Sequence, residues 1–474
     1  MAEKSVQQNT TPAAQAHVPS VTITQNQTTV PFDLRSSVSI PQNNKLTLEI
    51  LKKLPKAELH CHLDGSARIS SIIELAKEQG VELPTFDEEE LRKIVCVDHT
   101  CQSLEQYLRG FEITLRVLQK PYALTRVMYE VCEDAHKDGV RYLEVRFSPI
   151  LHTKEGLSLS TIMEAVIQGQ HMAEYNLNII VRVIVCGMRQ LPPEVTKDLA
   201  EIAWRYRHKG VAGFDLAGPE EGFSSKIHEG AFDIVRRKLV NCTLHSGEAS
   251  GPESIQDSIR YCGAHRIGHG TSLIKSPTLM NFVRDRRIAL ECCVTSNLHT
   301  KSVPSIEAHP IRKFFNAGVI VVPCCDNTTV SSVTLSGEYF LIQNTFDFGL
   351  EEMLRMIDYG FSAAFVSVST KQRLRIEALK KALEVLEAHD YDTTGLLTVR
   401  QFDDIGMDLT QLAMHSGLTP KVKRVNNSPG ATSLFHTVME PPITIDVIKA
   451  LPKTDLHCRF DGSVSLATVW KEIK

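Results

Sequence analysis

The feature of this 474-residue chain that most limits its fold is a series of eight short apolar runs separated by longer segments with helical spacing. The runs occupy residues 57–63, 140–147, 178–186, 211–216, 241–246, 266–269, 288–292 and 318–325. Two intervening segments, 124–139 and 193–210, end in Gly, which is common just past the C-terminus of a helix. Alternating strands and helices favour parallel βαβ units, and eight such strands can close a barrel. We therefore predict an α/β protein built on a (β/α)8 TIM-type barrel.

The predicted barrel domain spans residues 46–390 and leaves both ends of the chain outside it. Residues 71–120, between the first two runs, are too many for one crossover helix. We expect them to form extra helices over the C-terminal mouth of the barrel. Residues 1–45 contain 21 Gln, Asn, Thr or Ser and only 5 charged residues. That composition predicts a disordered N-terminal tail.

Residues 443–474 repeat the beginning of the predicted barrel. Aligned with residues 46–77 at a constant offset of 397, they share 12 identities in 32 positions. The stretch 391–442 is predicted to be a linker between the barrel and this repeat. We interpret the repeat as a truncated copy without catalytic function. It has Arg459 where the first copy has His62, and a guanidinium offers no lone pair to a metal ion.

The composition excludes several classes of protein. Lys and Arg number 52 against 56 Asp and Glu, a net charge of -4, which lacks the basic footprint of a nucleic-acid binder. No apolar run approaches the length of a transmembrane helix, and the first residues lack the apolar segment of a secretory signal. The 12 cysteines have irregular spacing, which favours reduced thiols. We expect a cytoplasmic enzyme that acts on a small molecule, and the sequence does not indicate its oligomeric state.

Four predicted strands end in residues that can bind a metal ion. His60 and His62 lie two positions apart in the first strand, so both imidazoles point to the same face. His245, His269 and Asp326 end or follow three other strands. Each residue alone could equally be a satisfied polar side chain, but barrel active sites gather at the C-terminal strand ends. Three imidazoles and one carboxylate suit Zn²⁺ better than Mg²⁺ or Ca²⁺.

The motifs at these strand ends follow a known order. They read HCHLDGS, RYLEVRFSP, FDLAGPE, TLHSGEASGPESI, RIGHG, TSN and the aspartate after the eighth strand. In this order the sequence resembles the adenosine deaminase family of the metal-dependent amidohydrolase superfamily, and its bacterial-type members most closely. The resemblance covers about residues 54–370. It implies the amidohydrolase barrel with one zinc ion per chain.

The resemblance implies a role for each strand-end residue. The implied zinc ligands are His60, His62, His245 and Asp326. Glu248 matches the proton donor to N1 of the purine, and His269 the residue that orients or deprotonates the attacking water, from which Asp326 also accepts a hydrogen bond. A bound Zn²⁺ would lower the pKa of water to about 7, which would supply hydroxide for attack at C6. The implied reaction, part of purine metabolism, is hydrolytic deamination of adenosine, and of 2′-deoxyadenosine, to inosine and ammonia.

Other positions match residues that bind the substrate. Besides His62, these include Asp64, which matches a residue near the ribose 5′-hydroxyl, and Gly218, which matches one whose backbone N–H meets N3. The apolar helix that covers the base in the family is matched by Leu104, Tyr107, Leu108 and Phe111. Without the resemblance, that spacing would indicate only the core face of a helix.

One position departs from the family. The family usually continues the aspartate after the eighth strand with a second aspartate, which faces N7 of the purine, whereas this chain has Asn327. N7 is an acceptor, so a carboxyl group must be protonated to donate to it, while an amide donates without titrating. Asn327 either preserves purine recognition or marks a changed base preference. Adenine, AMP and N6-substituted adenosine nucleotides therefore stay open as alternative substrates.

Three other classes of protein fit the sequence less well than a purine deaminase. A zinc ester or amide hydrolase on the same barrel is disfavoured because Glu248 matches the family residue that protonates a ring nitrogen, a role that such a hydrolase does not need. A nucleoside-binding protein without activity is suggested by the repeat and by Asn327, but the ligand set is intact. The editing-type cytidine deaminases need P-C-x-x-C, and the residues 323–327 here read PCCDN, which excludes that class.

Overall fold

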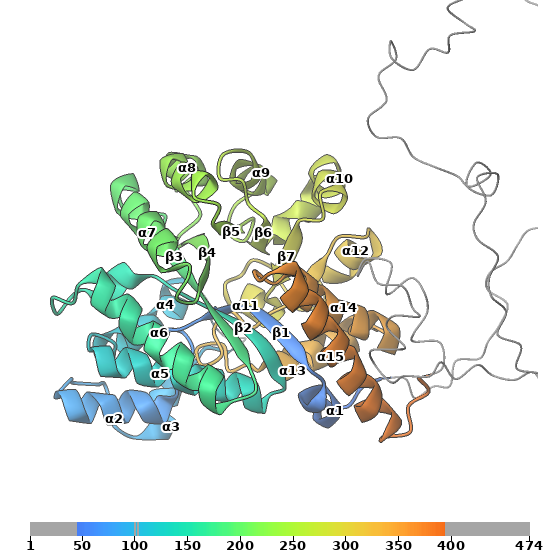
Figure 1. Cartoon of the computed structure of the whole chain (residues 1–474), viewed down its shortest axis with the longest axis horizontal. Coiled ribbons are helices and arrows are strands. Elements are labelled where there is room, and N and C mark those ends of the chain that lie inside the picture. The colour runs from blue at the N-terminus through green and yellow to red at the C-terminus, as the bar shows by residue number, and fades with distance from the viewer. Residues whose placement is uncertain (1–44, 99–100, 102–103, 394–474) are drawn as a thin grey trace, which may run out of the picture. The chain divides into compact units, whose positions relative to one another are not determined.

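Eight parallel strands form one sheet in the order of the chain, and the predicted barrel is confirmed (Figure 1). The protein is represented by a computed structural model, which describes residues 45–98, 101 and 104–393, without the side chains of 104–106, 108 and 109. The strands are β1 Lys56–His62, β2 Val140–Phe147, β3 Ile180–Met188, β4 Val211–Ala217, β5 Asn241–Ser246, β6 Arg266–His269, β7 Ala289–Cys292 and β8 Val321–Pro323.

The two ends of the sheet meet just after β8. A parallel bridge joins Cys61 to Asp326. The N–H of His62 donates to the carbonyl of Asp326, and the N–H of Asp326 donates to the carbonyl of His60, both at 2.7 Å. These bonds bring the first and last strands together at the C-terminal end of the barrel, where the sequence predicts the site.

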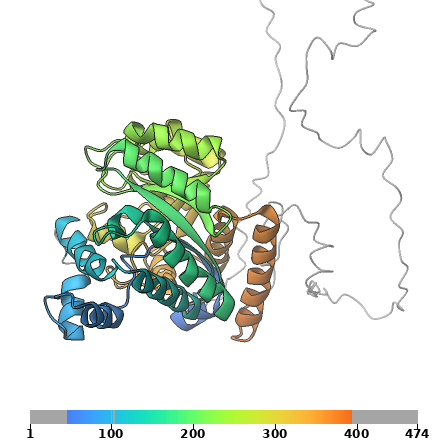
Figure 2. The ribbon, with the colours of Figure 1, turned by 60° about the vertical axis from the view of Figure 1, so that its left-hand side comes forward.

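Helices lie outside the strands in both views of the barrel (Figures 1 and 2). Those before β2 are α1 Leu48–Lys53, α2 Ile69–Gln79, α3 Glu88–Val95, α4 Leu104–Val117 and α5 Pro121–Lys137. The next are α6 Leu159–Asn176, α7 Pro193–Tyr206, α8 Glu229–Arg237, α9 Pro252–Arg260 and α10 Pro277–Asp285. The last are α11 Val294–His299, α12 Ile311–Asn316, α13 Leu335–Phe346, α14 Leu350–Ala363 and α15 Val368–Glu387. Short 3-10 turns follow three strands: η1 Pro149–His152, η2 Ser225–His228 and η3 Thr271–Lys275.

The extra helices expected between the first two strands are present as α2, α3 and α4. The helix limits follow ordinary capping chemistry. The side chain of Ser158 accepts the N–H of Thr161 at the start of α6, and Ser367 accepts that of Thr370 at the start of α15. Capping of this kind satisfies backbone donors that have no partner inside the helix.

Five of the predicted strands differ in their limits, three of them by a single residue at one or both ends and two, β3 and β8, by more. β3 begins at Ile180 instead of 178, because α6 continues to Asn176 and the chain needs a short connection before the strand. β8 is shorter than the predicted run 318–325. Gly318 has a φ of 82° and belongs to the turn after α12, and beyond Pro323 the chain bends toward β1. The apolar pattern predicts which residues are buried. Buried residues continue beyond the hydrogen-bonded ladder at both ends of this strand, so the predicted run is longer than the strand.

None of the eleven cysteines in the described part of the chain forms a disulfide. No helix in the described part of the chain combines the length and the apolar character needed to cross a bilayer. Residues 1–44 of the predicted N-terminal tail, 394–442 of the predicted linker and the whole repeat at 443–474 lie outside the described residues, so those predictions stay predictions.

Candidate active site

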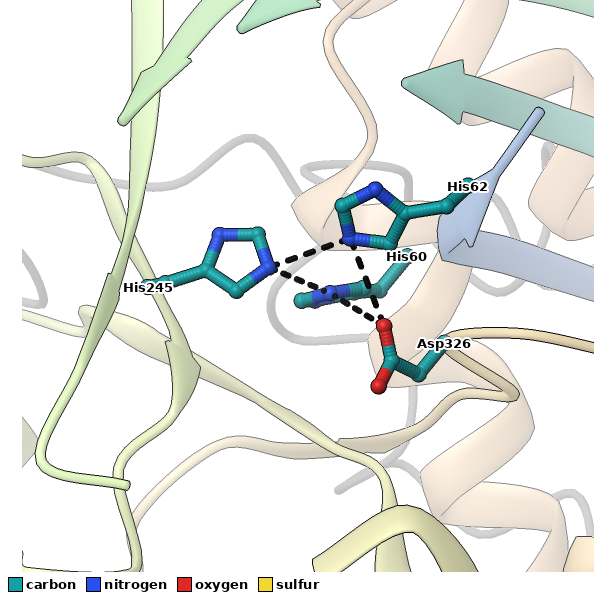
Figure 3. Close-up of side chains that lie close together, drawn as sticks. All are labelled: His60, His62, His245 and Asp326. Atoms are coloured by element: carbon teal, nitrogen blue, oxygen red, sulfur yellow. Dashed lines mark hydrogen bonds and ion pairs between the residues drawn. The ribbon is translucent and has the colours of Figure 1, made fainter. Parts of the chain in front are cut away.

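Four side chains converge at the C-terminal end of the barrel (Figure 3). β1 supplies His60 and His62, β5 supplies His245, and Asp326 follows β8. The Nε2 atom of His245 lies 3.1 Å from the Nε2 atoms of both His60 and His62. Oδ1 of Asp326 lies 3.4 Å from Nε2 of His60 and 3.3 Å from Nε2 of His62. One ligand atom from each residue lies within 4.8 Å of all the others. The structure therefore brings together the four residues that the sequence singled out.

The contacts of the imidazoles fit a bound cation. Nδ1 of His60 lies 2.9 Å from Oε2 of Glu291, and Nδ1 of His245 lies 3.0 Å from Oδ2 of Asp215. Since a carboxylate only accepts, each Nδ1 carries the hydrogen and each Nε2 presents a lone pair to the centre. Two lone pairs 3.1 Å apart repel each other unless a cation lies between them. Burial also lowers the pKa of His60, and takes that of His62 well below its ordinary value. His60 and His62 are then neutral, as metal binding requires. Burial also opposes protonation of His245, but the neighbouring Asp215 carboxylate outweighs it and raises the pKa of His245.

Asp326 completes the group as an ionised carboxylate. Ser296 donates to its Oδ2 at 2.6 Å. Burial alone would raise the pKa of the Asp326 carboxyl, but its contacts with His60 and His62 hold it well below the ordinary value. The backbone of Asp326 is left-handed, with a φ of 64°, and that of His269 has a φ of 63°. Such angles are uncommon outside glycine and cluster at functional sites.

A buried network of carboxylates and arginines lies behind the imidazoles. It consists of Glu144, Arg146, Asp215, Arg266 and Glu291, and each of these residues is at most 2% exposed. Arg146 lies 3.0 Å from Asp215 and 2.8 Å from Glu291, and Arg266 lies 2.7 Å from Glu291 and also pairs with Glu144. Burial opposes ionisation of Glu291, but Arg146 and Arg266 outweigh it and hold the pKa of Glu291 well below its ordinary value.

No local motif in the sequence points to this carboxylate–arginine network. The signal that could have found it is the presence of charged residues inside strands that are otherwise apolar. A buried charge needs a partner, and here the partners orient the imidazoles. Because they fix the orientation of the imidazoles, such residues would influence the affinity for a metal ion without touching it.

Glu248 and His269 lie beside the group formed by His60, His62, His245 and Asp326. Oε1 of Glu248 accepts the hydroxyl of Thr300 at 2.8 Å and the amide of Asn297 at 3.3 Å. Oε2 of Glu248 lies 3.6 Å from Nε2 of His269. The same Asn297 amide lies 3.0 Å from Nδ1 of His269. The ring centroid of His269 is 4.9 Å from that of His60. A carboxyl group and an imidazole thus share one side of the site.

Asp64 and Gly218 also lie at the C-terminal end of the barrel. Asp64 is buried, and its Oδ1 has no hydrogen-bond partner among the described residues. Burial raises the pKa of Asp64 to about 6. Gly218 directly follows β4 with a φ of 93°, and a Cβ atom there would collide with the side chain of Gln190. The positive φ favours glycine at this position, and the residue is exposed.

Helix α4 contributes a polar contact that the sequence analysis did not expect. The amide nitrogen of Asn327 donates to the hydroxyl of Tyr107 at 2.7 Å. That hydroxyl also lies 3.2 Å from Oγ of Ser331 and 3.5 Å from Oδ2 of Asp326. Asn327 is closely packed, because a Cβ atom at Gly65 would overlap its side-chain oxygen. Expecting Tyr107 to be simply part of an apolar cover was therefore incomplete, since its hydroxyl binds the residue that departs from the family.

The rest of the predicted cover is only partly described. Phe111 is half-buried, and its ring centroid lies 6.0 Å from that of Tyr107. Leu104 and Leu108 lie in α4, but their side chains are outside the described part of the structure.

Comparisons with known proteins agree with this geometry. The family model for adenosine deaminase matches residues 55–381. A protein of Dictyostelium discoideum named "Probable adenosine deaminase" is 52% identical over 439 residues, which make up 92% of this chain but 55% of that relative. This chain thus spans about half the length of that relative. The adenosine deaminase of Clostridium acetobutylicum is 38% identical over 333 residues, 70% of this chain and 98% of that protein.

A solved structure is similar as well. The apo structure of the N6-methyl-AMP deaminase from Arabidopsis thaliana is 29% identical, with a TM-score of 0.64, and the match covers 71% of this chain and 100% of that one. The family model covers well over half of the chain, and the bacterial relative is matched over nearly its whole length. The chain therefore belongs to the adenosine deaminase family of enzymes.

Proposed function

We propose that this chain catalyses the zinc-dependent hydrolytic deamination of adenosine, and of 2′-deoxyadenosine, releasing inosine or 2′-deoxyinosine and ammonia. The observation that carries the proposal is the convergence of three imidazole Nε2 atoms and one carboxylate beside a second, independent carboxyl group. The first set suits a cation, and the second suits proton transfer to a ring nitrogen. The relatives named adenosine deaminase support the same reaction.

One Zn²⁺ per chain would be held by His60, His62, His245 and Asp326. When bound, it supplies Lewis-acid chemistry that brings the pKa of water to about 7. Asp215 and Glu291 keep two of the imidazoles in the tautomer that binds the ion. Three imidazoles and one carboxylate favour zinc over magnesium, whose preferred ligands are oxygens.

Glu248 would deliver a proton to N1 of the purine, so that the ring accepts the electrons of the attacking oxygen at C6. Thr300 and Asn297 both bind Oε1 of Glu248, which leaves Oε2 to face the ring nitrogen. His269, whose Nε2 is 3.6 Å from Oε2 of Glu248, would take or orient the proton of the attacking water. The two groups thus divide the proton transfers of the reaction.

The remaining contacts would bind the nucleoside. The unpartnered buried oxygen of Asp64 would accept the ribose 5′-hydroxyl, and the backbone N–H of Gly218 would meet N3. Asn327 gives one amide hydrogen to Tyr107 and keeps a second one for N7. His62 lies beside these groups, and Leu104, Tyr107, Leu108 and Phe111 would cover the base.

A related purine is the alternative substrate: adenine, AMP or an N6-substituted adenosine nucleotide. The similar Arabidopsis structure is that of an N6-methyl-AMP deaminase, and Asn327 leaves the base preference open. We also expect the protein to act in the cytoplasm.

The experiment that tests the proposal is a substrate panel on the full chain. Adenosine, 2′-deoxyadenosine, adenine, AMP and N6-methyl-AMP are compared by kcat/KM, with elemental analysis of the purified protein for metal. We expect the highest value for adenosine, one zinc per chain, and loss of turnover on chelation that zinc restores. Turnover of a nucleotide without turnover of adenosine would replace the leading proposal with the alternative.

A further inference from the structure

The loop that carries Glu248 is held by one buried carboxylate from a different loop. Glu220 follows β4 and is 8% exposed. Its Oε1 accepts the N–H of Gly247 at 2.5 Å, and its Oε2 accepts those of Glu248, Ala249 and Ser250 at 3.0, 2.7 and 3.0 Å. Four successive N–H groups that face one point form a concave anion site. In this protein, the anion is the chain's own side chain.

An arginine holds the preceding residues of the same segment. Arg189 follows β3 and is fully buried. Its guanidinium donates to the carbonyl of His245 at 2.5 Å, to that of Phe223 at 2.8 Å, and to the hydroxyl of Ser246 at 3.4 Å. A positive charge thus meets carbonyl oxygen at the start of segment 245–250, and a negative charge meets the N–H groups that follow. We call Arg189 and Glu220 the segment clamp.

The carbonyl groups around Glu248 are held as well. Thr271 donates to the carbonyl of Gly247 at 2.8 Å, and Ser302 donates to that of Glu248 at 3.0 Å. The peptide groups on both sides of the Glu248 Cα atom are therefore fixed. Charge-assisted hydrogen bonds are the strongest of these contacts, so the clamp contributes most to the direction in which the Glu248 side chain leaves the backbone.

We propose that Arg189 and Glu220 are positioning residues that fix Glu248 for proton delivery to the base. The inference rests on the proposed function, because it needs Glu248 to act in the reaction. Glu220 binds the backbone of the segment rather than the Glu248 carboxyl, so it acts through Glu248. Loss of the clamp lowers kcat, because a displaced acid transfers its proton more slowly. It changes KM little, because other residues bind the nucleoside.

The central variant is Glu220→Gln. It keeps the volume of the side chain but replaces one acceptor oxygen with an NH2 group that faces backbone N–H donors. A displacement on the order of 1 Å can cost about 10²-fold in rate. We expect kcat per bound metal to fall roughly 10- to 100-fold, with KM for adenosine little changed. Hydrogen–deuterium exchange of the amides 247–250 should become faster, and Glu220→Asp, which keeps the charge, should recover part of both losses.

Glu174→Gln is the matched control. Glu174 also accepts a backbone N–H, that of Val181 at 3.0 Å, and pairs with Arg182 at 2.8 Å, but it lies at the opposite end of β3. This variant should leave kcat and the exchange of 247–250 unchanged.

The outcomes separate the two proposals. A wild-type chain that does not deaminate adenosine contradicts the proposed function. An active wild type with an unchanged kcat in Glu220→Gln overturns the clamp alone, and so does a loss that lower metal content fully explains. If Glu220→Gln does not fold, Glu220→Asp is measured in its place. Unchanged exchange of 247–250 and unchanged kcat in that variant would then overturn the clamp.

Discussion

Different structural elements and different contacts hold the two halves of the site. In the half proposed to bind the metal (the metal half), His60 and His245 lie on strands, and buried carboxylates and arginines fix their imidazoles. In the base half, Glu248 lies on a loop, and Asn327 binds the hydroxyl of Tyr107 on α4. A cation needs lone pairs in fixed positions, which paired charges provide, whereas a neutral purine needs donors and acceptors that can differ between substrates. Changes in the metal half should therefore affect all substrates alike, and changes in the base half should discriminate between purines.

The largest effect is expected from Glu248→Gln, which tests whether the base half contains the group that protonates the substrate. The amide cannot deliver the N1 proton, so kcat should fall by about 10²- to 10⁴-fold while the fold and the zinc content stay unchanged. The measurement is single-turnover deamination together with elemental analysis. Near-normal turnover would show that the acid is another group.

A smaller effect is expected from Asp215→Asn in the metal half. The charge that opposes Arg146 and holds Nδ1 of His245 is lost, so zinc affinity should fall roughly 10- to 100-fold. Competition with a chelator measures this change, and excess zinc should restore turnover of adenosine and of other accepted purines in equal proportion. An altered preference between purines would break the division between the two halves.

Substitution of Asn327 tests whether the base half discriminates between purines. If its free amide hydrogen donates to N7, 7-deazaadenosine should be roughly tenfold poorer than adenosine, the contribution of about one hydrogen bond. Asn327→Asp should stay active at low pH and lose activity as the pH rises, because a carboxyl group donates only while it is protonated. Rate profiles against pH for both proteins provide the measurement. Equal turnover of adenosine and its 7-deaza analogue would mean that Asn327 does not read N7.

The smallest effect is expected from deletion of the chain from Pro441 onward. Both halves of the site lie within the predicted barrel domain, and Arg459 of the repeat cannot ligate zinc. Zinc content and kcat should match those of the full chain. A truncated protein that folds but has no activity would place part of the working site in the repeat.

The sequence predicted the features that local patterns can express. The apolar runs indicated eight strands, and the spacing of His60 and His62 indicated a shared face. Strand limits were less accurate near Ile180 and Gly318, because apolar character reports burial and not ladder hydrogen bonds.

Long-range partners could not be predicted from the sequence. Arg146 and Glu291 are 145 positions apart, and Asn327 and Tyr107 are 220 apart. A charge inside an apolar strand indicates that a partner exists, but it does not indicate which one. Glu220 gives no such signal, because its partners are backbone N–H groups, which every residue except proline carries.

The carboxylate–arginine network also governs how the barrel can fold. Arg146, Asp215 and Glu291 come from β2, β4 and β7, so their charges are matched only after strands from both halves of the chain have met. A partly assembled barrel would bury Arg146 with one partner missing, at a cost of several kcal/mol for each unpaired ion. We therefore expect native-like half-barrels to be too unstable to accumulate. The residues that prepare the metal site make the folding of the whole barrel cooperative.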